Sequence, residues 1–229
     1  MSHSSSPRFS HEPAFHAARS AQRATRDGPW NEGTPPTLAA VVAGVRVCRR
    51  CDLWRNATRG VPGEGPANAA MMLVGEQPGD REDLAGAPFV GPAGRVLNAG
   101  LERAGIPRTE TFVTNAVKHF KHEMRGKRRL HKTPDAGEVR ACRWWLDAER
   151  ALVRPKVVVA MGATAALGVF GKSTPIAKNR GHAFDLDDGA KVVVTYHPSF
   201  LLRAPDEAAK RKAFEEFVAD LKFAWRLAA

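Results

Sequence analysis

The chain has 229 residues, of which 43% are hydrophobic, so it can form one folded domain with a substantial core. Its net charge of +11 and its isoelectric point of about 10.1 favour a polyanionic partner such as a nucleic acid, although a basic protein without such a partner remains an alternative. No apolar run is long enough to span a membrane and no secretory signal is visible, so we expect a cytoplasmic protein, in the compartment of the bacterial nucleoid.

The sequence divides into a tail and one domain. Residues 1–36 mix Ser, His, Arg, Pro and Gly without an apolar period, which predicts a disordered basic tail. From Thr37 the pattern becomes helical, and residues 37–229 are expected to form a single domain. The cysteines number three, and two of them lie close together, which favours a reducing compartment and metal ligation over a disulfide framework.

Four apolar runs predict the strands of this domain, at residues 69–74, 111–117, 156–161 and 191–195. Helical patterns alternate with them at residues 96–104, 133–154 and 205–227, with a short Ala-rich helix after Gly162. Residues 172–189 are expected to form a loop with a minor strand pairing. The alternation predicts an α/β fold, a three-layer α/β/α sandwich with a central, mainly parallel four-stranded sheet.

Polar residues stand where these strands end. Gly75 and Glu76 follow the first strand, Asn115 lies near the end of the second, and His197 follows the fourth. Because the carboxyl ends of parallel strands share one edge of a sheet, where open α/β sheets bind ligands, we expect one site there. The turns after the first strand add further candidates: Gln77, Asp80, Glu82, Asp83 and Phe89. The alternative is an acidic surface loop beside a core phenylalanine.

The cysteines suggest a metal centre. Cys48 and Cys51 form a C-x-x-C pair, which by itself fits zinc, an iron–sulfur cluster or a redox pair. Cys142 adds a third thiol, and the nearest credible fourth ligand is His119. Three thiolates and an imidazole suit tetrahedral zinc or a cubane cluster, so the ligand types leave the metal open. Three unrelated buried cysteines are the alternative.

The segment from Lys118 to Lys132 is strongly basic and resembles a loop that contacts nucleic acid. A solvated loop that is basic by chance is the alternative. His131 stands inside this run, beside a Thr-Pro pair that begins the next helix. Tyr196-His-Pro-Ser199, with the apolar residues after it, is a second candidate for contact with nucleic acid. Apolar side chains can act as a wedge that fills the gap left in a duplex by a flipped base.

Together these stretches resemble the motifs of family 4 uracil-DNA glycosylases. The matching stretches are Gly75-Glu-Gln-Pro-Gly-Asp80, Gly86-Ala-Pro-Phe-Val-Gly-Pro-Ala-Gly94, Thr114-Asn-Ala-Val-Lys118 and His197-Pro-Ser199, with the cysteines in order. Lys127-Arg-Arg-Leu-His131 further resembles the KRRIH loop of the UdgX-type branch, which cross-links itself to uracil-containing DNA. The resemblance runs from about Thr37 to the final helix.

The resemblance implies an α/β/α fold, a structural [4Fe–4S] cluster and excision of uracil by base flipping. By this likeness, Phe89 would stack on the flipped uracil and Asn115 would bind its edge, while Gly75, the Gln77 backbone and Asp80 would line the pocket. His197 would stabilise the negative charge that develops on uracil O2. The cluster would be held by Cys48, Cys51, His119 and Cys142, with zinc as the alternative metal.

The UdgX-type likeness gives His131 and Glu76 their expected roles. The imidazole of His131 would attack C1′ in place of water, and Glu76 would steady the sugar cation or accept the imidazole proton. The DNA would be contacted by Lys127, Arg128, Arg129 and Ser199. Because an N-glycosidic bond to imidazole resists hydrolysis, the reaction would stop after one turnover.

Two departures from the family pattern bear on these expectations. A histidine, His119, stands at the third cluster position where family 4 has cysteine, a change that the UdgX-type branch shares; His122 is the less favoured alternative to it as a ligand. Leu130 replaces the isoleucine of KRRIH with a side chain of similar volume. We expect a monomer that binds uracil-containing DNA, single-stranded or duplex, and releases uracil. The competing interpretations are a conventional glycosylase with turnover and a non-catalytic iron–sulfur module that binds nucleic acid.

Overall fold

The computed structural model describes residues 35–229, so the predicted tail lies outside the described residues except for its last two positions. The strands are β1 (Met71–Gly75), β2 (Thr111–Asn115), β3 (His122–Arg125), β4 (Arg128–His131), β5 (Val157–Met161), β6 (Ala183–Asp185) and β7 (Lys191–Thr195). The α-helices are α2 (Leu38–Arg46), α3 (Asp80–Ala85), α4 (Pro92–Ala104), α5 (Ala136–Val153), α6 (Ala163–Phe170), α7 (Ile176–Asn179), α8 (Pro198–Leu201) and α9 (Glu207–Ala228). Two 3₁₀ turns, η1 (Asp52–Arg55) and η2 (Arg108–Glu110), complete the order.

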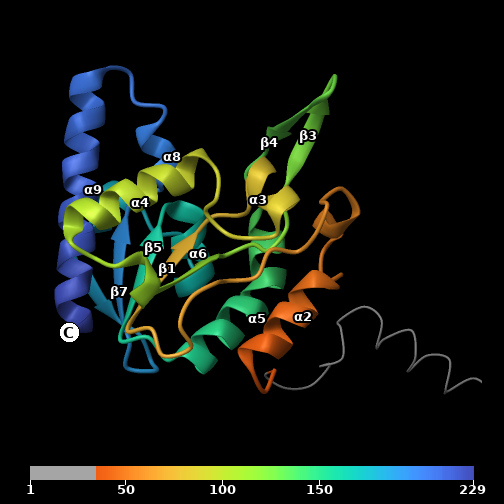
Figure 1. The fold of residues 1–229 in the computed structure, drawn as a ribbon, viewed down its shortest axis with the longest axis horizontal. Helices are drawn as coiled ribbons and strands as arrows, with labels where there is room; N and C mark the ends of the chain where they lie inside the picture. The colour runs from red at the N-terminus through yellow and green to blue at the C-terminus, as the bar shows by residue number, and fades with distance from the viewer. Residues whose placement is uncertain (1–34) are drawn as a thin grey trace, which may run out of the picture.

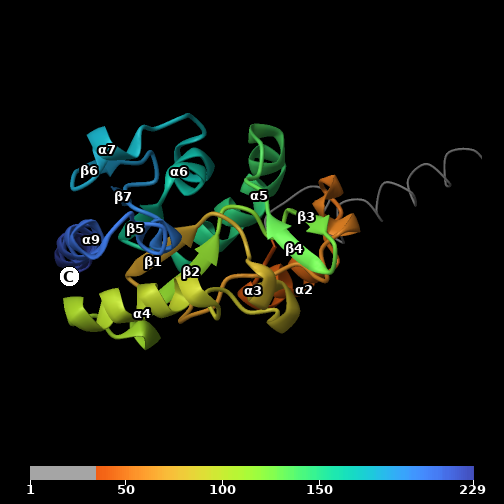
Figure 2. The same ribbon diagram turned by 90° about the horizontal axis from the view of Figure 1, so that it is seen from above.

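The central sheet has the strand order β2-β1-β5-β7-β6 (Figure 1 and Figure 2). Strands β2, β1, β5 and β7 are parallel, and β6 pairs antiparallel with β7 at the edge. The four predicted strands are therefore confirmed, but the predicted sheet of four strands is wrong by one. Residues 172–189 do contribute the strand pairing that the sequence indicated, yet β6 has only three residues and a partly exposed pattern, which gives little apolar signal.

Helices cover both faces of the sheet, as the predicted sandwich requires (Figure 2). Along β1, Met71 and Leu73 pack against residues of α4 and α9, whereas Met72 and Val74 pack against residues of α5 and α6. Successive side chains of a strand point to opposite faces, so a strand covered on both sides is apolar throughout. Helix α2 packs against α5 in a third apolar cluster, which also contains the cysteines.

The helix ends follow their capping residues. Helix α4 begins at Pro92, four residues before the predicted start, because proline at the first helical position fits the geometry there, and it ends at Gly105 with a φ of 73°. Helix α5 begins after Asp135, whose carboxylate accepts the backbone N–H groups of Gly137 and Glu138. No helix within residues 35–229 is long and apolar enough to cross a membrane.

The basic segment is a β-hairpin rather than the predicted loop. Strands β3 and β4 pair antiparallel, and Arg125 opposite Arg128 leaves Gly126 and Lys127 as a two-residue turn. Gly126 has a φ of 60°, which the first position of a type II′ hairpin turn requires. The hairpin projects from the carboxyl edge of the sheet, near α3 (Figure 1). Its charged side chains concealed the strand pattern in the sequence.

Candidate active site

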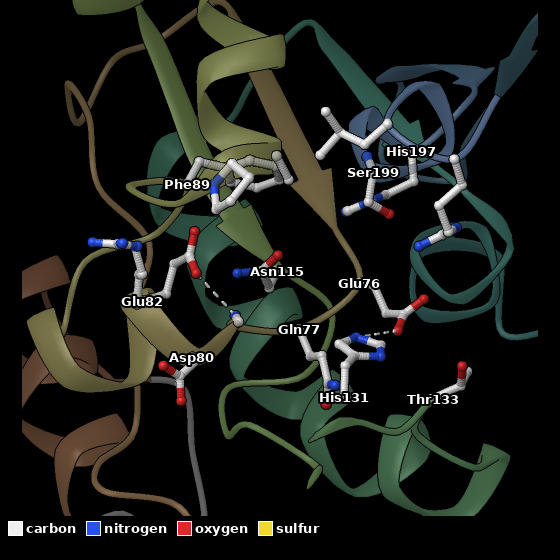
Figure 3. Close-up of a pocket in the computed structure, with 16 residues that line it drawn as sticks. Glu76, Gln77, Asp80, Glu82, Phe89, Asn115, His131, Thr133, His197 and Ser199 are labelled. Carbon is white, nitrogen blue, oxygen red and sulfur yellow. Dashed lines mark hydrogen bonds and ion pairs between the residues drawn. The ribbon is translucent and has the colours of Figure 1, made fainter. Parts of the chain in front are cut away.

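A cavity of about 660 Å³ lies at the carboxyl edge of the parallel strands. Its lining comes from the ends of β1, β2 and β4, from α3 and α4, and from the start of α8 (Figure 3). The predicted site residues that line it are Glu76, Gln77, Asp80, Phe89, Asn115, His131, His197 and Ser199. Residues from the ends of separate strands therefore line one cavity at this edge, while their roles in a functional site stay predictions. Lys127, Arg128 and Arg129 lie outside the cavity lining.

Gly75, Phe89 and Asn115 lie close together at the floor of the cavity. Gly75 pairs with Asn115 across β1 and β2, and a Cβ atom on Gly75 would lie 2.4 Å from Asn115 Oδ1 and 2.5 Å from Phe89 Cζ. Only glycine allows this approach. Phe89 has a φ of 56°, a backbone conformation that non-glycine residues adopt rarely and that is concentrated at functional sites. Asn115 Oδ1 is buried without a hydrogen-bond partner among the described residues, so the floor offers a ligand an unpaired acceptor.

His197 forms one wall, with its ring centroid 6.1 Å from that of Phe89. The backbone N–H of Ser199 donates to His197 Nδ1 at 3.2 Å, so this nitrogen is an acceptor and carries no proton. Burial lowers the pKa of His197 to about 4, with the Glu76 carboxylate partly opposing the shift. The ring is therefore neutral at pH 7, with its proton on Nε2, where it can serve as a donor.

Glu76 and His131 lie next to each other in the cavity (Figure 3). His131 Nε2 lies 3.1 Å from Glu76 Oε1, and the Thr164 hydroxyl donates to Glu76 Oε2 at 3.2 Å. Burial raises the pKa of Glu76, but the contact with His131 and the hydrogen bond from the Thr164 hydroxyl hold it below its usual range. The carboxylate is thus ionised at pH 7 beside a half-exposed imidazole.

The Gln77 side chain fixes the base of the hairpin. Its Nε2 donates to the carbonyl oxygens of Lys121 at 3.2 Å and Lys132 at 2.9 Å, and its Oε1 accepts the N–H of Lys121 at 2.9 Å. The N–H of Lys132 also donates to the Lys121 carbonyl at 3.0 Å. The sequence suggested only a backbone role for Gln77, whereas its amide joins both ends of the segment that carries His131.

Arg129 fixes the middle of the hairpin to α3. Its Nε lies 2.6 Å from Asp80 Oδ1 and its Nη1 lies 2.5 Å from Asp83 Oδ2. Nη1 also donates to the Thr58 hydroxyl at 3.2 Å, and the guanidinium lies 5.5 Å from the Phe120 ring centre. Charge-assisted contacts with two carboxylates hold the guanidinium in one place. The arginine is directed into the protein, while its expected contact with DNA stays a prediction.

A buried ion pair between Lys118 and Glu149 contacts the end of β2. Lys118 Nζ lies 2.7 Å from Glu149 Oε2 and donates to the Asn115 carbonyl at 2.8 Å and to the Thr114 hydroxyl at 2.6 Å. Glu149 Oε1 accepts the backbone N–H of Gly63 at 2.8 Å. Both charged side chains are almost fully buried, so each relies on the other. No local pattern predicts this pair, because its members lie 31 positions apart.

The cysteines lie in the third apolar cluster, where α2 packs against α5. Cys48 and Cys142 are buried there, and Cys51 packs against the same cluster. Trp145 Nε1 donates to Cys48 Sγ at 3.1 Å, and the Lys118 N–H donates to Cys142 Sγ at 3.2 Å. Within residues 35–229, however, no three His, Cys, Asp or Glu side chains are grouped so that they could hold one metal ion.

Comparison with known proteins places this arrangement in a family. A family model described as the uracil DNA glycosylase superfamily matches residues 62–222. The chain is 39% identical over 173 residues to a type-4 uracil-DNA glycosylase of Thermotoga maritima, which covers 75% of this chain and 86% of that protein. It is 33% identical over 193 residues to a type-4 uracil-DNA glycosylase of Archaeoglobus fulgidus, with 81% and 90% covered. A type-5 uracil-DNA glycosylase of Pyrobaculum aerophilum is 30% identical over 182 residues, with 72% and 76% covered.

Proposed function

We propose, starting from the fact that this chain belongs to the uracil DNA glycosylase superfamily, that it excises uracil from DNA and then binds the abasic sugar covalently through His131. The observation that carries the second step is the contact of His131 with Glu76 inside the cavity, at 3.1 Å. The hairpin that carries His131 is anchored at its base by Gln77 and at its middle by Arg129, which supports a fixed position for this histidine beside Glu76.

Uracil would be recognised at the floor of the cavity. The unpaired Oδ1 of Asn115 can accept the N3–H of uracil, and the amide nitrogen can donate to O4, whereas cytosine presents the opposite pattern on this edge. The ring of Phe89 offers a surface on which the flipped base stacks. Gly75 leaves the space that these two side chains need.

Bond cleavage leaves negative charge on the uracil and positive charge on the sugar. The Nε2–H of neutral His197 would donate to the uracil O2 as its charge develops. The ionised Glu76 would stabilise the oxocarbenium-like sugar at C1′. Both groups are preorganised by other contacts, His197 by Ser199 and Glu76 by Thr164, so little reorganisation is needed during the reaction.

Trapping follows when His131 replaces water at C1′. The C1′–N1 bond breaks and its electron pair leaves with uracil, while a ring nitrogen of His131 donates its lone pair to form the new C1′–N bond. The imidazolium so formed loses its remaining N–H proton, for which the neighbouring Glu76 carboxylate is the nearest acceptor. The neutral product is an N-glycosyl imidazole, a poor substrate for hydrolysis, so turnover ends.

The hairpin turn and the start of α8 would contact the strand around the flipped nucleotide. Lys127 and Arg128 are exposed at the hairpin turn, and Ser199 lines the cavity mouth with Leu202. Basic side chains there would pair with phosphates, which gives binding that weakens with salt. We propose that the protein acts on this DNA as a monomer.

We further propose that Cys48, Cys51, Cys142 and His119 hold a [4Fe–4S] cluster. Three thiols in one apolar cluster, N–H donors to two of their sulfur atoms, and a buried His119 Nδ1 without a partner among the described residues fit this group. The ligands of a four-iron cluster bind different irons and so lie farther apart than the ligands of one zinc ion. The cluster would stabilise the packing of α2 against α5. Absorbance near 400 nm that is lost in Cys142→Ser would support it; zinc without this band would contradict it.

Truncating Phe89 is expected to weaken uracil selection. In Phe89→Ala, affinity for DNA whose uracil nucleotide carries a 2′-fluoro group that slows cleavage should fall about fivefold to 150-fold, since stacking contributes about 1–3 kcal/mol per base. Affinity for the same oligonucleotide with thymine should stay within about twofold, because the flipped base alone touches this ring. Fluorescence anisotropy with both oligonucleotides measures the two values. Val90→Ala, at the exposed neighbouring position, is the matched control. Equal losses on both oligonucleotides would contradict the stacking role.

Replacing Arg129 by alanine is expected to slow covalent trapping much more than it slows excision of uracil. In Arg129→Ala the hairpin loses its contacts with Asp80 and Asp83, so the imidazole of His131 is no longer fixed beside Glu76. Adduct formation should slow at least about tenfold, because small misplacements of a reacting group are costly. Release of uracil should change less than about threefold. Quenched time points on a denaturing gel measure both. Arg128→Ala, next on β4 and exposed, should leave the adduct rate at saturating protein unchanged.

A denaturing gel with a uracil-containing oligonucleotide, and a thymine control, tests the proposed function directly. A uracil-specific band shifted by the mass of the protein and stable to SDS and heat is the expected result. Strand breakage after alkali without such a band would indicate a conventional glycosylase, which the fold and the comparisons fit equally well. Binding without either signal would indicate a non-catalytic module.

A further inference from the structure

A groove between α4, α8 and α9 continues directly from the active-site cavity. Its volume is about 370 Å³, and Pro92 and Leu202 line both the groove and the cavity. Figure 1 shows α4 lying across α9, with α8 beside the start of α4. The groove therefore begins where the cavity for the flipped base ends.

The floor of the groove is apolar. Val96 and Ala99 contribute from α4, Leu201 from α8 and Phe214 from α9. Ala99 is exposed, and Val96 and Phe214 are partly exposed, so this surface is accessible along its length. Proteins that bind single strands combine surfaces that receive bases with cations that follow the backbone. The apolar floor of the groove is suited to receive a base.

Cations border this floor. Arg95 projects from α4, and Lys210 and Arg211 project from α9. Glu207 is the one carboxylate among the described lining residues, and its Oε1 lies 3.3 Å from Lys210 Nζ. Within residues 35–229, the side chains of Arg95 and Arg211 make no ion pair or hydrogen bond, so both guanidinium groups are available to an anion. These cations at the border of the groove are suited to bind the phosphates of a nucleic acid.

We propose that this groove holds the nucleotide next to the flipped uracil on the same DNA strand. The base of that nucleotide lies on the apolar floor, and its phosphates lie against Arg95 and Arg211. The shared residues Pro92 and Leu202 make the two cavities continuous, and the positive rim complements the backbone. This assignment rests on the proposed function, because the strand reaches the groove only when it also enters the cavity.

The test compares wild type with the double variant Arg95→Ala/Arg211→Ala on three single-stranded oligonucleotides. The uracil stands in the middle, at the 5′ end or at the 3′ end, and its sugar carries a 2′-fluoro group that slows cleavage. With the central uracil, the variant should bind at least about fivefold more weakly. The slope of log K against log salt should fall by about 1.4, since each single-strand phosphate contact contributes about 0.7. One of the two end-placed uracils should abolish the difference, because the neighbouring nucleotide is then missing.

A matched control lies on the same two helices. Arg103 and Lys222 border a different cavity between α4 and α9, so Arg103→Ala/Lys222→Ala should leave affinity and salt slope unchanged. Ala99→Asp, at an exposed position on the groove floor, should weaken binding like the double variant.

Three results would overturn the groove assignment. The first two are an unchanged affinity in the groove variants and a loss of affinity that persists with both end-placed uracils. The third is a lower mass of the groove variants than of wild type in sedimentation, which would make the groove a contact between copies of this chain. Uracil release from an unmodified oligonucleotide, measured on the same wild-type preparation, tests the proposed function separately. If release occurs and the groove variants bind normally, the groove assignment alone is wrong. If wild type neither releases nor binds uracil-containing DNA, both proposals are wrong.

Discussion

Replacing His131 by serine is expected to abolish the proposed covalent trapping and to allow turnover. In His131→Ser the nucleophile is lost, and the vacated space beside Glu76 admits water to C1′. The covalent band should fall below detection, at least about 100-fold, while uracil release continues beyond one equivalent of protein. The amounts of adduct and free uracil, followed over time with excess oligonucleotide, measure both effects.

His122 provides the matched control for this variant. It lies directly opposite His131 in the hairpin, so His122→Ser makes the same chemical change on the same pair of strands. The His122 ring stacks on Phe120, at a centroid distance of 4.9 Å, and is not part of the cavity lining. We expect the adduct to form normally in this variant. Loss of both adduct and release in His131→Ser would show instead that His131 is structural.

Breaking the buried ion pair is expected to cost more stability than any exposed change in the described domain. In Lys118→Met, Glu149 keeps a buried charge whose nearest cation is gone, a change that typically costs about 3–5 kcal/mol. For a domain of this size, the melting temperature should fall by about 6–20 °C, at about 2–4 °C per kcal/mol. Differential scanning calorimetry of both proteins measures the shift.

An exposed ion pair supplies the comparison. Lys191 Nζ lies 2.6 Å from Asp185 Oδ1, and both side chains are well exposed, so Lys191→Met should cost at most about 1 kcal/mol. The double variant Lys118→Met/Glu149→Leu removes both charges and should recover part of the stability, although the Gly63 N–H and the Thr114 hydroxyl lose their acceptor. A melting temperature of Lys118→Met within about 2 °C of wild type would contradict the role of this pair.

The sequence predicted the parts of the fold that depend on local patterns. The four parallel strands are continuous apolar runs, and their order along the chain, alternating with helices, sufficed for the layered architecture. Strand β6 was not counted because three partly exposed residues carry no clear period. The hairpin was missed as a strand pair because its inward and outward side chains are almost all charged or polar, although Gly126 marks its turn.

The site was predictable to the extent that it depends on strand ends. Glu76, Asn115 and His197 could be placed together because parallel strands end at one edge. The contacts that hold them could not be predicted, since the side chain of Gln77, the clamp of Arg129 and the hydroxyl of Thr164 join positions far apart in the chain. Sequence spacing identifies candidates for chemistry, whereas the partners that orient them emerge only from tertiary packing.

The base of the hairpin is closed by a backbone hydrogen bond, so the hairpin can be gained or lost as a unit. The chain leaves the domain at Lys121 and returns at Lys132, where the two backbones already share a hydrogen bond of 3.0 Å. The ten residues between them could thus be inserted or deleted without changing the sheet, the floor of the cavity or the histidine at its wall. The side chains of Gln77, Asp80 and Asp83, which hold the hairpin in place, all lie outside these ten residues, so a domain that gains the hairpin already has the groups that position His131.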